Sequence, residues 1–165
     1  MGSKVSRIEV LAPLEGRVIE LAEVPDPVFA GALVGPGAAI DPDRSGGSRA
    51  FAPVSGRLVK LHPHAYIVQT PDGFGVLTHL GIDTVQLADA GFELLAAEGD
   101  EVSAGTPVVA WNPATVESGG RSPVVPVIAL GADASSVRVV RPGPVASGAG
   151  LFVWAAALAG SGPPG

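Results

Sequence analysis

The sequence predicts an all-β protein, a β-sandwich or barrel-like sandwich with only short helical turns. Its 165 residues include 23 glycines and 16 prolines, too many for long helices but suited to short strands joined by tight turns. Apolar residues make up 47% of the chain and charged residues 16%, a composition that can bury a core and is unlike that of a disordered chain. We expect one domain over residues 1–154 and a flexible tail over residues 155–165.

An internal repeat supports this fold class. The segment at residues 12–21, APLEGRVIEL, returns at residues 52–61 as APVSGRLVKL. In each copy a proline opens an extended segment, where its missing N–H does no harm, and a glycine permits the turn into a strand. Two copies predict two related halves of one sandwich, because a solenoid needs at least three repeats.

The segments around the repeat follow the same pattern of short pieces and turns. Between the copies, residues 26–40 contain short apolar runs separated by glycine turns, and residues 41–48 form a polar loop. Residues 58–69 and 74–80 are rich in β-branched and aromatic side chains, and residues 70–73, TPDG, are typical of a turn. We therefore expect residues 58–80 to form a β-hairpin.

The second half of the chain also predicts short elements joined by turns. We expect one helical turn over residues 92–97, and a turn, strand, turn and strand over residues 98–108. Residues 108–111 and 124–130 predict buried strands. Residues 113–118 predict a short helix with a proline at its start, and residues 151–154 a last strand.

All three histidines of the chain fall in or beside the expected hairpin, at His62, His64 and His79. If residues 70–73 form a four-residue loop, His64 lies directly opposite His79, and their Cβ atoms are about 4.5–5.5 Å apart on one face. A three-residue loop would instead send one of the two side chains to the other face. The hairpin therefore predicts a site built on a pair of histidines.

Two kinds of chemistry fit such a site. A metal site would use His62 and His64, which share a strand face, together with His79 and Asp83. Alternatively, one neutral imidazole attacks a phosphorus atom while the second donates a hydrogen bond to the phosphoryl oxygens. The chain has no phosphate-binding loop or kinase motif, so a phosphoryl group would come from another protein.

Composition excludes several other classes. The formal net charge is −6 with scattered Lys and Arg, which argues against a nucleic-acid partner. There is no cysteine, which rules out disulfides and zinc–thiolate sites. Residues 1–14 have no apolar export signal, and the apolar run at residues 151–159 is too short to span a bilayer. We therefore expect a cytoplasmic protein without membrane insertion.

Several runs resemble the glucose-family enzyme IIA component of the bacterial sugar phosphotransferase system. The run THLGIDTV at residues 78–85, with PHA at residues 63–65, resembles that family most closely. The similarity covers about residues 8–130 in a consistent order. Its other motifs are APLxG (12–16), VPDPVF (24–29), APVxG (52–56), EGDxV (98–102) and PVV (123–125).

This resemblance implies a function and a set of roles. The fold would be a β-sandwich on a duplicated motif, and His79 would accept a phosphoryl group from the phosphocarrier protein HPr. His64 would support it, and the group would pass to a IIB domain of a glucose- or N-acetylglucosamine-type permease. Regulatory targets are also implied. The transfer would need no cofactor, although His64 and His79 would share a zinc ion in some regulatory complexes.

The resemblance also implies a docking surface for partner proteins, and two other protein classes share some of these motifs. The surface would be an apolar patch with acidic side chains at its rim, made of Asp26, Val28, Phe29, Val34, Asp83 and Val85. His62 stands where relatives usually carry Thr or another polar residue, and it would be a third ligand if zinc binds. A lysostaphin-like zinc peptidase would use His62, His64, His79 and Asp83, but with the two motifs in reversed order. A lipoyl-type carrier needs a lysine at an exposed turn, and Lys4 and Lys60 are not in that setting.

Overall fold

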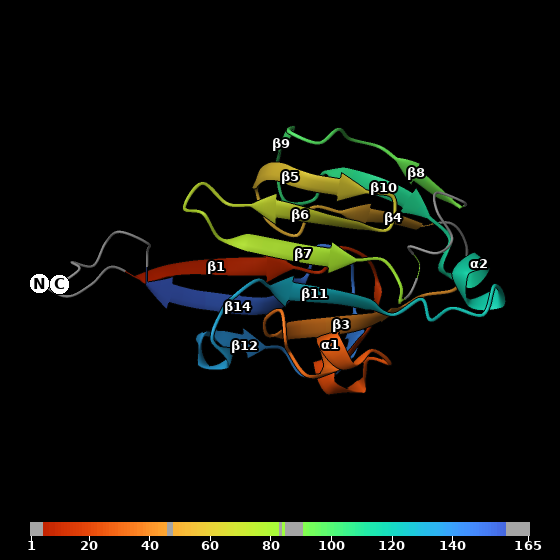
Figure 1. The fold of residues 1–165 in the computed structure, drawn as a ribbon, viewed down its shortest axis with the longest axis horizontal. Helices are drawn as coiled ribbons and strands as arrows, with labels where there is room; N and C mark the ends of the chain where they lie inside the picture. Colours follow the sequence, from red (N-terminus) through yellow and green to blue (C-terminus); the bar gives the residue numbers. More distant parts are fainter. Residues whose placement is uncertain (1–4, 46–47, 83, 85–90, 158–165) are drawn as a thin grey trace, which may run out of the picture.

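The structure, a computed structural model, describes residues 5–45, 48–82, 84 and 91–157, and its regular elements are mostly antiparallel strands (Figure 1). This confirms the all-β prediction. The strands are β1 (Val5–Leu11), β2 (Gly16–Ile19), β3 (Gly37–Pro42), β4 (Ser48–Phe51), β5 (Gly56–His62), β6 (Ala65–Gln69), β7 (Gly75–His79), β8 (Phe92–Leu94), β9 (Glu101–Val102), β10 (Pro107–Trp111), β11 (Val125–Ala129), β12 (Val137–Val139), β13 (Gly143–Val145) and β14 (Gly150–Ala157). The short helices are α1 (Pro27–Ala30) and α2 (Pro113–Ser118), with 3₁₀ turns at η1 (Leu21–Glu23) and η3 (Ala134–Ser136).

The described strands form one large sheet and two small ones. The large sheet has the order β13-β2-β3-β11-β7-β6-β5-β9, and the small sheets have the orders β1-β14-β12 and β4-β10-β8. In Figure 1 the sheet of β4 lies with β5 and β6 in the upper part of the view, and the sheet of β1 lies below. No helix in the described part of the chain is long and apolar enough to cross a membrane.

This order consists of two copies of one unit that meet at β7 and β11. The first unit is contiguous and runs from β4 to β10, whereas the second is split into β1–β3 and β11–β14. Equivalent strands have equivalent neighbours: β5 pairs with β6 and β9, as β2 pairs with β3 and β13. At the junction, Thr78 of β7 is the partner of Val127 of β11. The contiguous unit is thus inserted into the split one.

The repeat found in the sequence lies at equivalent places in the two units. The backbone N–H of Leu11 donates to the carbonyl of Pro53 (2.9 Å), and the N–H of Phe51 donates to the carbonyl of Pro13 (2.9 Å). These reciprocal bonds join the starts of the two copies. They confirm the prediction that the repeat builds two related halves.

The two glycines of the repeat are required by close approach of backbone. A Cβ atom at Gly16 would lie 2.2 Å from the carbonyl oxygen of Asp41, and one at Gly56 would lie 2.1 Å from that of Gln69. Because no side chain fits at such distances, both positions need glycine.

A second, weaker repeat becomes visible only in the structure. Residues 102–111, VSAGTPVVAW, occupy the places in one unit that residues 145–154, VASGAGLFVW, occupy in the other. The N–H of Gly105 donates to Ala52, and the N–H of Gly148 donates to Ala12, both at 2.9 Å. The copies share only the first valine, the glycine and the final tryptophan, so similarity in the sequence alone is slight.

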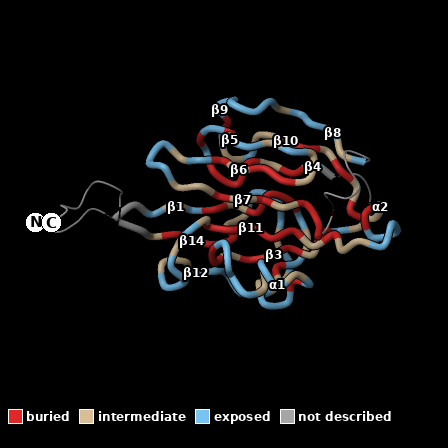
Figure 2. The backbone as a smooth tube through the Cα atoms, viewed as in Figure 1, coloured by how far each residue is buried: buried red, intermediate tan, exposed pale blue. Residues whose placement is uncertain are grey.

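The core is shared by both units. Buried apolar side chains from both form one large cluster, and Figure 2 shows the buried segments along the central strands. A second, small cluster contains Val24, Ala39 and Ile82, with Phe29 packed against it. This small cluster lies beneath the segment that carries α1.

Several local predictions are corrected by the structure. The helical turn expected at residues 92–97 is wrong, because Phe92–Leu94 forms β8 and pairs with β10. Phe92 stacks on Trp111 of β10 at 6.0 Å between ring centroids, so cross-strand packing overrides local preference. The expected strand over residues 58–69 is two strands, β5 and β6. α1 was not expected, whereas α2 agrees with the helix expected at residues 113–118.

The end of the chain also differs from the expected boundary. The last strand, β14, continues to Ala157, where it pairs with Val5 of β1. The first three residues of the expected tail are therefore part of a sheet. The remaining residues of the expected tail, 158–165, lie outside the described residues.

Candidate histidine site

His79 is the last residue of β7, and it lies on the outward face of that strand. Along β7, Val76 and Thr78 are buried, while Leu77 and His79 are partly exposed, as the alternation of a strand requires. Its Nδ1 atom lies 2.6 Å from the carbonyl oxygen of Gly81. A carbonyl oxygen can only accept a hydrogen bond, so Nδ1–H is the donor. The neutral ring then has its lone pair on Nε2.

The segment after His79 is fixed by tight local contacts. Gly81 has a φ of +83°, and a Cβ atom there would lie 2.6 Å from the side chain of Thr84. The buried Thr84 hydroxyl donates to the carbonyl of Leu80 (2.7 Å), and the N–H of Ile82 donates to the carbonyl of Ser122 (2.8 Å). The carbonyl that holds His79 is therefore fixed in place. Sequence reasoning did not give Gly81 or Thr84 a role, although a glycine two residues after a histidine is a usable signal.

His64 lies beside His79, but not through the register expected from the sequence. The partner of His79 across β6 and β7 is Ala65, because the bond from Thr70 N–H to the Phe74 carbonyl leaves three residues in the loop. His64 avoids the opposite face because it belongs to the two-residue turn between β5 and β6 and is not bound by strand alternation. The His64 and His79 rings meet edge to face, with centroids 5.3 Å apart. The predicted pair is present for a different geometric reason.

His62 extends the pair to a row of three imidazoles. It ends β5, is exposed, and stacks on His64 with centroids 5.6 Å apart and planes 22° apart. Partial burial, followed by repulsion from charged His79 and His62, lowers the pKa of His64 below its ordinary value of 6.5. His64 is therefore neutral at pH 7 and offers one N–H and one lone pair.

An aromatic side chain from the other unit closes the site. Phe29 of α1 lies 5.2 Å from His79 between ring centroids. Asp26 caps α1, since its carboxylate accepts from the N–H groups of Val28 (2.8 Å) and Phe29 (3.4 Å). The helix is thus held over the small cluster of Val24, Ala39 and Ile82, with Phe29 directed at the histidine.

Apolar side chains around α1 are open to solvent. Val28 is 42% exposed and Val34 37% exposed, and Leu33, which the sequence did not single out, is 73% exposed. Exposed apolar side chains gathered in this way are typical of a surface that docks a partner. The other two residues expected on this surface, Asp83 and Val85, lie outside the described residues.

The described residues do not offer a metal centre. Within residues 5–45, 48–82, 84 and 91–157, no group of three or more His, Cys, Asp or Glu side chains is arranged to hold a metal ion. The zinc site considered from the sequence would need Asp83, which is outside that range, or a ligand from a partner.

Comparison with known proteins agrees with the resemblance seen in the sequence. Residues 8–134 match the family model described as phosphoenolpyruvate-dependent sugar phosphotransferase system, EIIA 1. The chain is 34% identical over 151 residues to the glucose-specific EIIA component of Staphylococcus aureus strain Mu50, which covers 89% of each chain. It is 35% identical over 137 residues to that of Bacillus cereus, covering 82% of this chain and 81% of the relative.

A solved structure shares the fold. The glucose permease IIA of Mycoplasma capricolum superposes with a TM-score of 0.81 and 35% identity, and the match covers 90% of this chain and 96% of that one. The likeness therefore extends to the whole architecture.

Proposed function

Because the chain belongs to the EIIA 1 family of the phosphoenolpyruvate-dependent sugar phosphotransferase system, we propose that His79 carries its phosphoryl group. A protein of this family is a phosphocarrier, and it transfers the group through a histidine. The observation that supports His79 is the bond from its Nδ1–H to the carbonyl of Gly81, which places the lone pair of the neutral ring on Nε2. That nitrogen attacks phosphorus on phospho-HPr, forming an N–P bond as the bond from phosphorus to HPr breaks.

His64 supports this step as a hydrogen-bond donor. Its ring meets that of His79 edge to face, so an N–H on its rim is within reach of a phosphoryl group on His79. The pKa of His64 is lowered, first by burial and then by repulsion from His79 and His62. The His64 ring is therefore neutral in the protein that carries no phosphoryl group. When the dianionic phosphoryl group arrives, a donor already in place stabilises its oxygens without reorganisation.

The exposed apolar patch around α1 is the docking surface in this proposal. It consists of the exposed Val28, Leu33 and Val34 and the partly buried Phe29, with Asp26 at its edge, and it adjoins His79 through Phe29. The chain has a net charge of −6, which favours partners with a basic face. HPr and a IIB domain would dock here in turn, because one histidine must face both.

The sugar is inferred from the relatives. Those at 34% and 35% identity are glucose-specific components, so we infer a glucose-type permease as the final acceptor. An N-acetylglucosamine permease remains the alternative acceptor. Transfer from the phosphorylated protein to each purified IIB domain distinguishes them.

A direct test uses phosphoenolpyruvate, enzyme I and HPr, with the mass of the intact protein as the readout. One added phosphoryl group, seen only when HPr is present, supports the proposal. The substitution Val28→Asp should slow acceptance from HPr without removing it, while Val139→Asp, an equally exposed valine on β12, should leave the rate unchanged. No added mass with the complete cascade would contradict the phosphocarrier assignment of this chain.

A further inference from the structure

The backbone of His64 is held in place by the hairpin around it. Its carbonyl accepts a hydrogen bond from the N–H of Leu80 (2.7 Å), and the turn that carries it is closed by the pairing of His62 with Ala65. Pro63, the other residue of this turn, has a φ angle that its own ring restricts. The place from which the His64 side chain starts is therefore well defined.

The side chain of His64 is held by the rings of two other histidines. Within the part of the chain that the structure describes, its imidazole forms no hydrogen bond and has two ring contacts. One is with His79, edge to face at 5.3 Å, and the other is with His62, nearly parallel at 5.6 Å. In the proposed function a phosphoryl group on His79 changes the first contact. The contact with His62 is therefore the one that can hold the His64 ring throughout transfer.

His62 is itself placed to support a neighbouring ring. It is the last residue of β5, and its backbone is paired with Ala65 across the hairpin. Because the residue before a proline favours an extended backbone, Pro63 keeps His62 in the strand. The His62 side chain is exposed, and exposed side chains usually contribute little to the stability of a fold. Loss of its ring should therefore affect the histidine site more than the fold.

We propose that His62 is a positioning residue for phosphoryl transfer, and that the face of its imidazole holds the His64 ring against His79. This inference rests on the phosphocarrier function proposed above. A hydrogen-bond donor that is already oriented stabilises developing charge without reorganisation, whereas a donor on a mobile side chain must first be ordered. The support comes from a planar ring, so another planar ring should replace His62 and a charge without a ring should not.

Substitutions at His62 separate the ring from its charge. His62→Phe keeps a planar ring, His62→Lys keeps a positive charge, and His62→Ala keeps neither. In single-turnover transfer to a IIB domain, His62→Ala and His62→Lys should be slower by roughly three- to tenfold, the loss expected from one aromatic contact. His62→Phe should keep most of the rate. The IIB concentration that gives half the maximal rate should not change, because the exposed apolar side chains around α1 are untouched.

The position of the His64 ring can be measured without any phosphoryl group. Nuclear Overhauser effects between the ring protons of His64 and His79 should be retained in His62→Phe and weakened in His62→Ala. Absence of phosphorylation in the unmodified chain would remove the proposed function and with it the role of His62. Normal phosphorylation of the unmodified chain, with unchanged Overhauser effects in His62→Ala, would remove the role of His62 alone.

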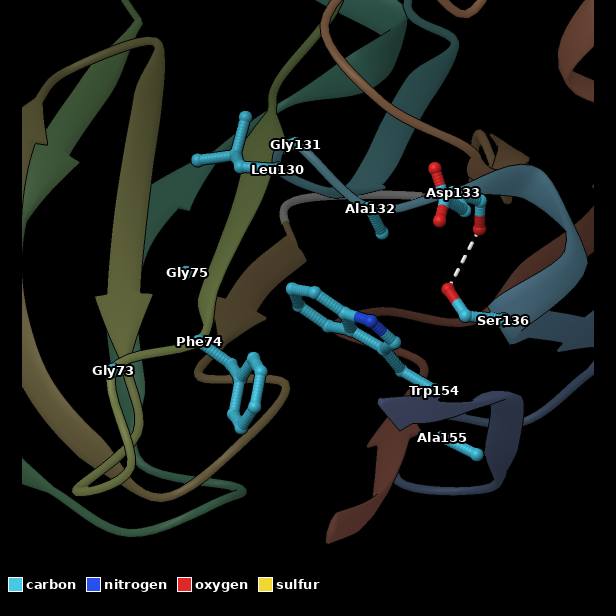
Figure 3. Close-up of a pocket in the computed structure, with 10 residues that line it drawn as sticks. All are labelled: Gly73, Phe74, Gly75, Leu130, Gly131, Ala132, Asp133, Ser136, Trp154 and Ala155. Atoms are coloured by element: carbon cyan, nitrogen blue, oxygen red, sulfur yellow. Dashed lines mark hydrogen bonds between the residues drawn. The ribbon is translucent and has the colours of Figure 1, made fainter. Parts of the chain in front are cut away.

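An aromatic pair at the other end of β7 gives a matched control. Figure 3 shows Phe74, which precedes the first residue of β7, beside Trp154, and their ring centroids are 5.1 Å apart. Both rings pack in or against the large core cluster. Phe74→Leu removes this ring contact, so it should lower the free energy of unfolding and leave the rate of transfer unchanged. His62→Ala should slow transfer and leave the free energy of unfolding nearly unchanged.

Three results would overturn the proposal. One is an unchanged rate of transfer in His62→Ala, which would mean that the His64 ring needs no support from residue 62. Another is equal slowing in His62→Phe and His62→Ala, which would mean that a planar ring is not what matters. The third is a rate restored by His62→Lys but not by His62→Phe, which would assign the effect to charge.

Discussion

The two β units have the same strand pairing, but they differ at the residue that follows the paired Thr78 and Val127 in the strands β7 and β11, which join the units. In the contiguous unit, Thr78 is followed by His79, which is partly exposed at the end of β7. In the split unit, the partner of Thr78, Val127, is followed by Ile128, which is fully buried. Equivalent positions thus carry a reactive imidazole in one unit and a core side chain in the other.

The connections beside these residues explain the difference. In the contiguous unit, β5 and β6 are joined by two residues, Pro63 and His64, which leaves the end of β7 open. In the split unit, β2 and β3 are joined by a long segment that includes α1, and this segment packs onto the sheet and directs Phe29 at His79. The duplicated strands place residues at equivalent positions in the two units. The short connection of the contiguous unit adds His64 beside His79, and the long connection of the split unit adds the apolar surface around α1.

The largest effect should come from removing the one imidazole that the comparison singles out. His79→Ala should abolish acceptance of the phosphoryl group, because no other imidazole has a fixed Nδ1–H donor to the carbonyl of Gly81. The measurement is the intact mass after incubation with phosphoenolpyruvate, enzyme I and HPr. His62→Ala is the matched control and should accept the full added mass. Full phosphorylation of His79→Ala would remove His79 from the mechanism.

The next effect concerns the turn that distinguishes the two connections. His64→Gln should slow onward transfer to the IIB domain by roughly 10²–10⁴-fold, the usual contribution of a general acid or base, because an amide cannot gain or lose a proton as an imidazole can. Acceptance from HPr should fall less, because the amide still donates a hydrogen bond but cannot change its charge. Single-turnover rates of the two steps measure this. An equal loss in both would contradict the role given to His64.

A third test concerns what the units share. Gly16→Ala and Gly56→Ala should each lower the free energy of unfolding by roughly 1–3 kcal/mol, because their Cβ atoms would overlap a carbonyl oxygen of the neighbouring strand. Gly75→Ala is the control, since its Cβ would make only ordinary contacts, the nearest at 3.4 Å. Urea denaturation gives the three values. A large loss for only one of the first two would show that the units are not equivalent at this point.

The smallest expected effect is on the titration of His64. Its pKa is lowered first by burial, then by His79, then by His62. The unfolded chain therefore binds a proton on this residue first as pH falls below about 6.5. The contribution of His64 to stability is constant above that pH and becomes unfavourable as pH falls towards the pKa of the folded state.

NMR titration of the His64 ring measures the effect directly. The midpoint should lie below 6.5 in the unmodified chain, rise in His79→Ala, and rise less in His62→Thr. A midpoint above 6.5 in the unmodified chain would mean that a nearby anion outweighs burial, and the neutral donor assigned to His64 would be wrong.

Much of the fold could be predicted from the sequence, because the two copies of the first repeat share their proline, glycine and apolar positions. The second repeat keeps only three identical residues in ten, and β8 looked helical because its strand character depends on packing against Trp111. The histidine pair was predicted from the hairpin, although the loop has three residues and not four. His64 still meets His79 because it stands in a turn, a detail that strand counting cannot supply.

Other parts of the site depend on contacts that sequence spacing does not record. The cap that Asp26 provides to α1 and the direction of Phe29 need the small cluster beneath them. The bond from His79 to Gly81 depends on a backbone conformation that only the folded chain defines. The residues were visible in the sequence, whereas the choice of nitrogen was not.

The most direct test of this account is to identify the phosphorylated nitrogen. The chain with ¹⁵N-labelled histidine, phosphorylated through enzyme I and HPr, would be studied by two-bond ¹H–¹⁵N and by ³¹P NMR. The account predicts one phosphoryl group on Nε2 of His79, with Nδ1 still protonated against the carbonyl of Gly81. Phosphate on Nδ1 of His79, or on His62 or His64, would contradict it.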